Sequence, residues 1–395
     1  MSKKIAHAWA YSLPSTLALM VPFDLLASLA MDVYLPVVPQ MPAALATSPS
    51  LIQLTLSAYI LILGLGQIIF GPLSDWIGRR PVVLGGAGLF AIASFLLSVA
   101  SSGGEFLVLR ILQALGASAA LVGTFATVRD VFADKPESTT IYGLFSSILA
   151  FVPALGPILG AVVALTLGWR AIFAMLGVMA VLAILHAWPR WHETRPKSTR
   201  QRSVAIFSIL GSQSFWVYTI GFGAAMGAFF VFFSISPRVL IDRSGWSQLS
   251  FSLAFASVAL VMIVATRFIG VFVKMWGIPG CFIRGVSVMA GGAIVLALLS
   301  SLMETGFISF VMPMWLIAVG IVLVVSVTAN GALQDFGDTA GTAVAAYYCI
   351  QSLIVSGVGT LSVLALDGST AWPLVAYCLV MSTAGMTGYA ILKQK

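Results

Sequence analysis

The sequence predicts an all-α polytopic membrane protein with twelve transmembrane helices in two six-helix halves. Hydrophobic residues make up 60% of its 395 residues, and charged residues make up only 8%. A soluble domain usually carries about 25% charged residues, so a soluble globular protein is excluded. Apolar runs near the length of about 20 residues that a bilayer core requires recur along the whole chain.

The apolar runs form two sets of six, separated by one long polar stretch. The first set lies at about 14–36, 51–71, 81–101, 105–127, 139–166 and 169–188, and the second at about 213–235, 249–272, 280–302, 306–328, 340–365 and 371–391. The first run is too long for a signal peptide and carries two acids. We therefore predict an N-terminal six-helix half (1–188), a cytoplasmic linker (189–205) and a C-terminal six-helix half (206–395).

The distribution of lysine and arginine predicts that both termini are cytoplasmic. With the N terminus inside, 16 of the 20 basic residues lie in cytoplasmic segments or at their edges, as the positive-inside rule requires. The exceptions are Arg110, within a helix, and Arg170, Arg238 and Arg243, outside. The segment with Asp335 and Asp338 carries no basic residue and departs from the rule. The basic residues form short clusters, so nucleic-acid binding is excluded.

The sequence offers no metal-binding or catalytic centre. Its three cysteines lie within apolar runs without metal-binding spacing, so we predict neither disulfides nor a metal site. Its three histidines lie near helix ends or in the linker, and no sizeable soluble domain accompanies them. A membrane-bound enzyme or receptor is therefore the least favoured class, and we expect no cofactor.

The two halves show a weak internal repeat at an offset near 200 residues. The pattern Gly71-x3-Asp75-x2-Gly78 recurs as Gly270-x3-Lys274-x2-Gly277. Repeats of this kind relate two halves by an axis along the membrane normal. The seventh helix lacks acids and carries several phenylalanines, which either pack in the core or against lipid or form the wall of an apolar pocket.

Two acids in the first helix are the most costly residues to place in a membrane. An aspartate at the centre of a membrane helix costs about 2.5–3.5 kcal/mol, so Asp24 and Asp32 are candidate functional residues. Their spacing puts them about 12 Å apart along the helix and about 80° apart around it, so they can face one cavity at two depths. The alternative for either acid is a structural one, capping a helix end near the headgroups.

The fourth helix carries Arg110 within an apolar segment. One interpretation is that its side chain reaches the outer surface along the helix. The other is that it compensates Asp24 or Asp32, because it is the only basic residue within an apolar run. The second interpretation predicts a buried charge network between the first and fourth helices.

Three motifs resemble signatures of the major facilitator superfamily. The turn GPLSDWIGRRP (71–81) resembles its loop signature; Gly71 would allow close helix approach, Asp75 would bind a helix N-terminus, and two arginines would anchor the turn. LVLRILQALGASAA (107–120) resembles a second signature. FVPALGPILGA (151–161) resembles the antiporter signature of its exporters. The resemblance implies a major facilitator fold, with gating positions at Gly71, Asp75, Gly78, Arg79, Arg80, Gly156, Pro157 and Gly160.

Several further stretches are similar to the chloramphenicol and florfenicol exporters, and most of all to the florfenicol type. They are PFDLLASLAMDVYLP (22–36), ATVRDVFA (126–133), LGWRAIF (167–173) and SVTANGAL (326–333). The resemblance implies a monomeric drug:proton antiporter of the bacterial inner membrane that exports phenicol antibiotics by alternating access, using the proton gradient. It implies that Asp24 binds substrate and proton, that Asp32 is a second proton site, and that Arg110 favours their ionised forms.

Phenicols are neutral molecules with hydroxyl and amide groups, so we expect hydrogen bonds to a carboxylate and aromatic packing. Candidate wall residues are Tyr59, Phe151, Phe229 and Tyr347. The alternative function is a polyspecific multidrug:proton antiporter that also accepts cationic drugs, which would share every motif. A resistance panel of lipophilic cations distinguishes the two.

Overall fold

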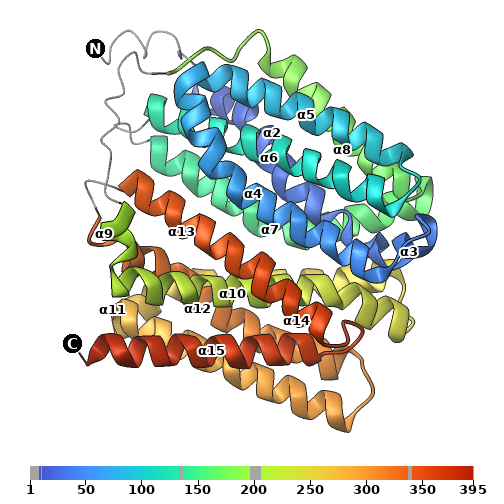
Figure 1. The fold of residues 1–395 in the computed structure, drawn as a ribbon, viewed down its shortest axis with the longest axis vertical. Helices are drawn as coiled ribbons and strands as arrows, with labels where there is room; N and C mark the ends of the chain where they lie inside the picture. Colours follow the sequence, from blue (N-terminus) through green and yellow to red (C-terminus); the bar gives the residue numbers. More distant parts are fainter. Residues whose placement is uncertain (1–8, 10, 133–136, 196–205, 337–339, 395) are drawn as a thin grey trace. The chain divides into compact units, whose positions relative to one another are not determined.

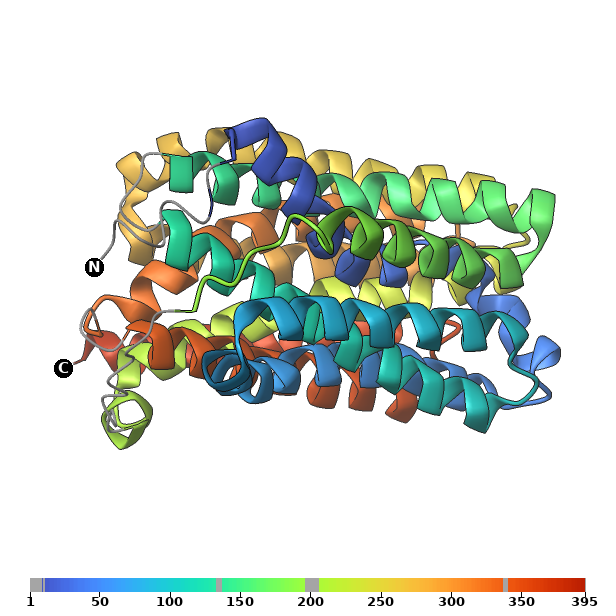
Figure 2. The same ribbon diagram turned by 90° about the horizontal axis from the view of Figure 1, so that it is seen from above.

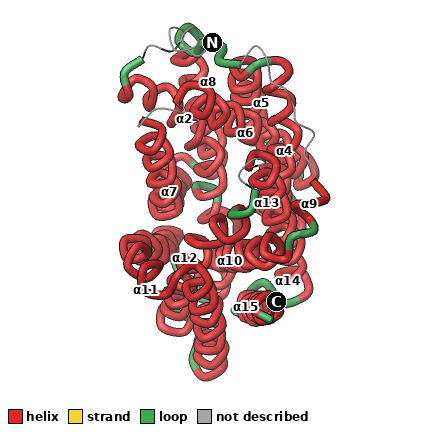
Figure 3. Tube along the Cα trace, turned by 90° about the vertical axis from the view of Figure 1, so that its left-hand side faces the viewer, coloured by secondary structure: helices red, strands yellow, loops and turns green. Residues whose placement is uncertain are grey.

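The computed structural model describes residues 9, 11–132, 137–195, 206–336 and 340–394. In that part of the chain every regular element is a helix, and Figure 3 shows helices joined by loops without a strand. The chain divides into two compact units, Met1–Arg202 and Ser203–Lys395, which are described separately. Of the predicted linker, 196–205 lies outside the described residues, as do Lys3, Lys4, Lys135, Asp338 and Lys395.

Unit 1 contains six spans (Figure 1). The first combines α2 with two short helices, and each of the others is a single helix. The elements are α2 (Leu13–Asp32), η1 (Leu35–Gln40), α3 (Met41–Ala44), α4 (Pro49–Ile77), α5 (Arg79–Val99), α6 (Gly103–Phe132), α7 (Glu137–Leu167) and α8 (Trp169–Ala187). The first span was predicted as one helix over 14–36, whereas α2 ends at Asp32 and the chain continues as a 3-10 helix.

Unit 2 contains the remaining six spans, in three of which the helix type changes along the span. The elements are α9 (Ile206–Leu210), α10 (Gln213–Pro237), η2 (Arg238–Arg243), α11 (Gln248–Leu302), η3 (Phe307–Val311), α12 (Met312–Leu333), α13 (Ala340–Ile354), η5 (Val355–Gly359), α14 (Thr360–Ala365) and α15 (Trp372–Lys393). Serine caps start two of the long helices: Ser212 accepts from Phe215 N, and Ser247 from Ser250 N.

The twelve predicted spans are helical in the described part of the chain. Ten of the described helices are long and apolar enough to cross a membrane. One of them, α11, has 55 residues and a break at Gly277, so it contains the predicted eighth and ninth spans. The 31-residue α7 corresponds to the fifth. The predicted fold class is therefore confirmed, and the chain is a multi-pass membrane protein.

The two units share two local features: a turn at a glycine with positive φ and a close helix pair at a glycine. Gly78 and Gly277, which the sequence repeat pairs, both turn the chain with positive φ, 111° and 68°, a region that favours glycine. Close helix pairs also repeat: a Cβ on Gly86 would lie 2.6 Å from Ala119 Cβ, and one on Gly285 would lie 2.7 Å from Val324. These contacts join α5 to α6 and the second part of α11 to α12.

The phenylalanines of α10 belong to the core of unit 2. Phe230, Phe232 and Phe233 are buried, and Phe232 stacks against both Phe255 of α11 and Phe310 of η3 at 5.4 and 5.6 Å between ring centroids. Core packing is thus the observed role for these three side chains. Figure 2 shows the same helices from above.

Candidate functional site

Both candidate acids are buried in unit 1. Asp24 lies in the middle of α2 with 0% exposure, and neither of its carboxyl oxygens has a hydrogen-bond partner among the described residues. Asp32 is the last residue of α2 and is 5% exposed. A carboxylate at a helix C-terminus is not stabilised by the helix dipole. The capping alternative for Asp32 is therefore wrong for α2, where Asp32 occupies the opposite end from an N-cap.

Helix α7 approaches the end of α2 through the predicted antiporter motif. A Cβ on Gly156 would lie 2.6 Å from Asp32 Cβ, and one on Gly160 would lie 2.7 Å from the carbonyl carbon of Val33. Pro157 between them is buried, and α7 remains one helix across it. The two glycines thus bring the backbone of α7 directly against Asp32 and the residue that follows it.

Arg110 of α6 is fully buried, so the alternative in which it reaches the surface is wrong for this structure. Its guanidinium donates to Gln113 Oε1 at 2.6 Å and to the carbonyl of Ala30 at 3.2 Å. The rings of Tyr59 and Tyr34 lie near it, with centroids 4.4 and 5.1 Å from Cζ. These rings provide cation–π stabilisation, which is stronger in a site without water.

The predicted contact between Arg110 and an acid is absent. Within the described residues, no carboxylate oxygen lies within 4.0 Å of an Arg110 nitrogen. The partner of the charge is instead the C-terminal end of α2, where Ala30 is one of the last four residues whose carbonyls lack donors within the helix. The negative end of the helix dipole stabilises a cation there.

A chain of hydrogen bonds continues from Arg110 across unit 1. Gln113 Nε2 donates to Ser94 Oγ at 2.8 Å, and Ser94 Oγ donates to the carbonyl of Phe90 at 2.6 Å. Each group acts as acceptor toward Arg110 and as donor away from it, which fixes the orientation of the Gln113 amide. Arg110 is thereby tied to α2, α5 and its own helix α6.

The α4–α5 turn holds a second, charged cluster. Arg79 pairs with Asp75 at 2.5 Å and with Asp130 of α6 at 2.7 Å, and it also donates to Ser74 Oγ. The carboxylate at the N-terminus of α5 belongs to Glu193. The binding of Asp75 to the N-terminus of another helix stays a prediction.

Among the motif positions, the structure changes the expectation for Gly71 and adds contacts that were not predicted. A Cβ added to Gly71 would have no described atom of unit 1 within 4 Å, so close approach occurs at Gly156 and not at Gly71. Arg80 contacts the segment after α8, donating to the carbonyl of Trp188 at 2.8 Å. Asp130, which follows Arg129, and Glu193, which lies in the basic stretch between the two sets of spans, were not predicted as site residues.

The four candidate wall residues have different surroundings. In unit 1, Tyr59 is buried and donates to the carbonyl of Ala27 at 2.9 Å, whereas Phe151 is 52% exposed. In unit 2, Phe229 is half-buried beside Phe255, and Tyr347 is buried, stacks on Phe222 and donates to Thr328 Oγ1 at 2.9 Å. Their role as pocket wall remains a prediction.

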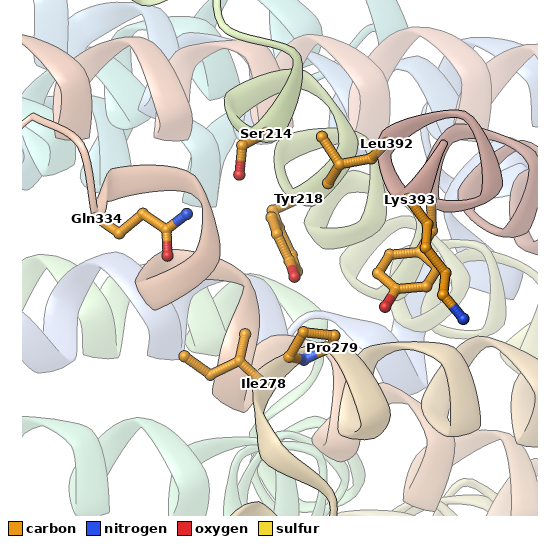
Figure 4. Close-up of a pocket in the computed structure, with 8 residues that line it drawn as sticks. Ser214, Tyr218, Ile278, Pro279, Gln334, Leu392 and Lys393 are labelled. Carbon is orange, nitrogen blue, oxygen red and sulfur yellow. The ribbon is translucent and has the colours of Figure 1, made fainter. Parts of the chain in front are cut away.

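Unit 2 contains a cavity of about 400 Å³ at one end of its helices (Figure 4). Tyr218 points into it between the ends of four helices, and Lys393 lies at its edge. The cavity contains none of the predicted site residues. Its lining consists of Ser214, Tyr218, Ile278, Pro279, Gln334, Tyr389, Leu392 and Lys393.

Sequence comparisons identify the family of this chain and several relatives. Residues 24–360 match the family model described as Major Facilitator Superfamily. The chain is 49% identical over 378 residues to a protein of Pseudomonas aeruginosa named "Chloramphenicol resistance protein", covering 95% of this chain and 90% of that protein. It is 28% identical to the "Multidrug resistance protein MdtL" of Salmonella typhi over 60% of each chain.

A solved structure shares the fold. The bacterial homolog to the human lysosomal transporter Spinster, in an inward-facing and occupied conformation, aligns with a TM-score of 0.75 over 96% of both chains. The identity is 15%, so this likeness concerns the fold alone.

Proposed function

Because the chain belongs to the Major Facilitator Superfamily, we propose that it exports phenicol antibiotics, such as chloramphenicol and florfenicol, in exchange for protons. The observation that carries the substrate class is the 49% identity, over 95% of the chain, to a chloramphenicol resistance protein. The more distant multidrug relatives cover only 60% of the chain, so the phenicol class is preferred to polyspecific export.

The unpaired acid on α2 supports proton coupling. An ionised carboxylate that is buried without a hydrogen-bond partner is costly in free energy, whereas the protonated acid is neutral. Both oxygens of Asp24 are in this situation among the described residues. In the proposed cycle, Asp24 takes up a proton when drug leaves on the outside. It releases the proton to the cytoplasm when water and drug reach it from the inside.

Asp32 and Arg110 complete the proposed site without an ion pair. Asp32 lies at the end of α2, two residues after the carbonyl that Arg110 binds. A positive charge held at this end lowers the cost of ionising a nearby acid. We assign Asp32 a second proton site and Arg110 the role of adjusting both acids. The proposal places the protein in the bacterial inner membrane as a monomer, with both termini in the cytoplasm.

Drug accumulation in energised cells tests the proposal. A susceptible bacterial strain that produces the protein should accumulate less chloramphenicol and florfenicol than one that produces Asp24→Asn. A protonophore should abolish this difference. Glu105→Gln is a matched control, because Glu105 is an exposed acid at the start of α6 and the change is chemically the same. Export that survives the protonophore would reject proton coupling, and efflux of lipophilic cations would favour the polyspecific alternative.

A further inference from the structure

The segment that follows α8 packs tightly on unit 1. We name residues Trp188–Arg195 the strap. Figure 1 shows the strap as an extended stretch that leaves the end of α8 and runs toward the start of α5. Although it belongs to the most polar stretch of the chain, Trp191 is only 1% exposed and Thr194 is also buried. A freely moving linker would bury neither side chain.

One end of the strap binds the α4–α5 turn through the carboxylate of Glu193. Glu193 Oε1 accepts from Arg79 N at 2.8 Å, and Oε2 accepts from Arg80 N at 3.2 Å. Oε1 also accepts from the backbone N–H groups of Thr194 and Arg195, at 3.1 and 2.9 Å. An anion at these first N–H groups of α5 is stabilised by the helix dipole, and the strap itself bends around the same carboxylate.

The α4–α5 turn is shaped to receive this carboxylate. Gly78 has φ 111°, and a Cβ at this position would lie 2.8 Å from Glu193 Cδ. Two further bonds close the contact: Arg80 donates to the carbonyl of Trp188 at 2.8 Å, and Arg195 donates to the carbonyl of Trp76. The strap and the turn are therefore held together from both sides.

The middle of the strap binds the helix that carries the acids. The ring of Trp191 lies 5.4 Å from Phe23 and 5.5 Å from Trp9, nearly perpendicular to both. Edge-to-face pairs of this kind are favourable beyond their burial. Phe23 directly precedes Asp24 on α2. Tyr11, just before α2, also donates to the carbonyl of Arg190 at 2.9 Å.

We propose that the strap is a positioning element that couples the α4–α5 turn to the part of α2 that holds Asp24, with Glu193 and Trp191 as its two anchors. Neither anchor is required to touch drug or proton. Movement of α2 relative to the turn must break the contacts of one anchor or the other. The structural part of this inference is independent of the proposed function, and only its transport consequence rests on that function.

A double-mutant cycle tests the coupling without any assumption about transport. Glu193→Gln replaces one acceptor oxygen by a donor at the α5 end, and Phe23→Leu removes one of the two rings that Trp191 contacts. Residues far apart without shared contacts have additive effects, whereas coupled residues do not. Each variant changes the unfolding equilibrium constant of the full chain in detergent by a measurable factor. We expect the factor for the double variant to be at least about twofold smaller than the product of the factors for the two single variants.

The control cycle pairs Phe23→Leu with Glu105→Gln. Glu105 accepts a backbone N–H from Ser101 at 3.0 Å at the start of α6, so it undergoes the same chemical change in the same unit. These two effects should multiply without coupling. Multiplicative effects for the Glu193 pair as well would overturn the proposal. If Glu193→Gln does not fold, the milder Trp191→Phe, paired with Arg80→Lys, tests the same connection.

The transport consequence is measured per folded molecule in proteoliposomes. Glu193→Gln should lower phenicol turnover about tenfold, the factor that corresponds to one weakened charge-assisted hydrogen bond, while Glu105→Gln retains wild-type turnover. Coupling in the cycle together with normal turnover would reduce the strap to a structural brace and overturn its positioning role. A wild-type protein that moves no phenicol would reject the proposed function, and the cycle would still decide whether the strap couples the two sites.

Discussion

The close contact between α7 and Asp32 predicts a large effect from one methyl group. In Gly156→Ala, the new Cβ would lie 2.6 Å from Asp32 Cβ. Two carbon atoms pack best at about 3.5–4.0 Å, so α7 or the end of α2 must move by about 1 Å. Neither atom can rotate away, because both Cβ atoms are fixed by their backbones.

Two opposing effects on the free energy of unfolding, helix propensity and overpacking, decide the outcome of Gly156→Ala. Replacing glycine by alanine inside a helix stabilises it by about 1 kcal/mol, while overpacking a dense contact costs about 1–3 kcal/mol. At Gly156 the overlap is between backbone-fixed atoms, so we expect a net loss of about 1–2 kcal/mol in the free energy of unfolding. At Gly85 of α5 no described atom lies within 4 Å of the new Cβ, so Gly85→Ala should be neutral or stabilising by up to about 1 kcal/mol.

The two variants are measured side by side by reversible unfolding in detergent and by phenicol efflux per folded molecule. We expect opposite signs in stability and an efflux at least about fivefold lower for Gly156→Ala, the factor that corresponds to 1 kcal/mol. If Gly156→Ala is as stable and as active as Gly85→Ala, then α7 does not need to lie against Asp32, and the motif has another role.

Three further predictions concern the buried charges and the driving force. Asp24→Asn should insert and fold at wild-type levels yet export no phenicol, because an amide neither takes up nor releases a proton near neutral pH. Retained export in a resistance assay would reject the role of Asp24. Arg110→Lys should lower efflux at least tenfold, since an ammonium cannot bind the Ala30 carbonyl, the Gln113 amide and both tyrosine rings at the same time. Unchanged efflux would show that any cation at this position is sufficient. If one proton exchanges for one neutral drug, a potassium–valinomycin potential at equal pH should drive export with about 2.3 kcal/mol per 100 mV; a response to pH gradients alone would exclude that exchange.

The order of the membrane spans and the positions of two turns could be predicted because they depend on local composition. Apolar length defined the spans, and the glycine pattern that pairs Gly78 with Gly277 indicated two turns that the structure builds with the same backbone conformation. The break after Asp32 was missed, although Pro36, Pro39 and Pro42 follow it and each removes a backbone donor. Apolarity alone does not distinguish a continuous helix from one that changes type.

The partners of the charged residues were harder to predict, because the sequence shows which residues are charged but not which neutral groups lie near them. Arg110 was expected to meet an acid, but it binds a carbonyl at a helix end, an amide and two rings. None of these has a formal charge. Likewise, Glu193 was not selected because it lies in a basic stretch that was assigned to a linker, and its partners are backbone N–H groups. Backbone groups at helix ends can be recognised as partners only when the positions of the helices in space are known.

The single-residue turn at Gly78 also has a consequence for how the protein is made. Helix α4 ends at Ile77 and α5 begins at Arg79, so no loop remains between the two spans. At Gly277 the two parts of α11 are joined in the same way. With no loop between them, the two spans of each pair can reach their final packing only when both are in the bilayer, because the turn at the glycine fixes the directions of the two helices. A bulky residue at either glycine would have to adopt a positive φ that side chains disfavour, so we expect it to lower the yield of folded protein in the membrane.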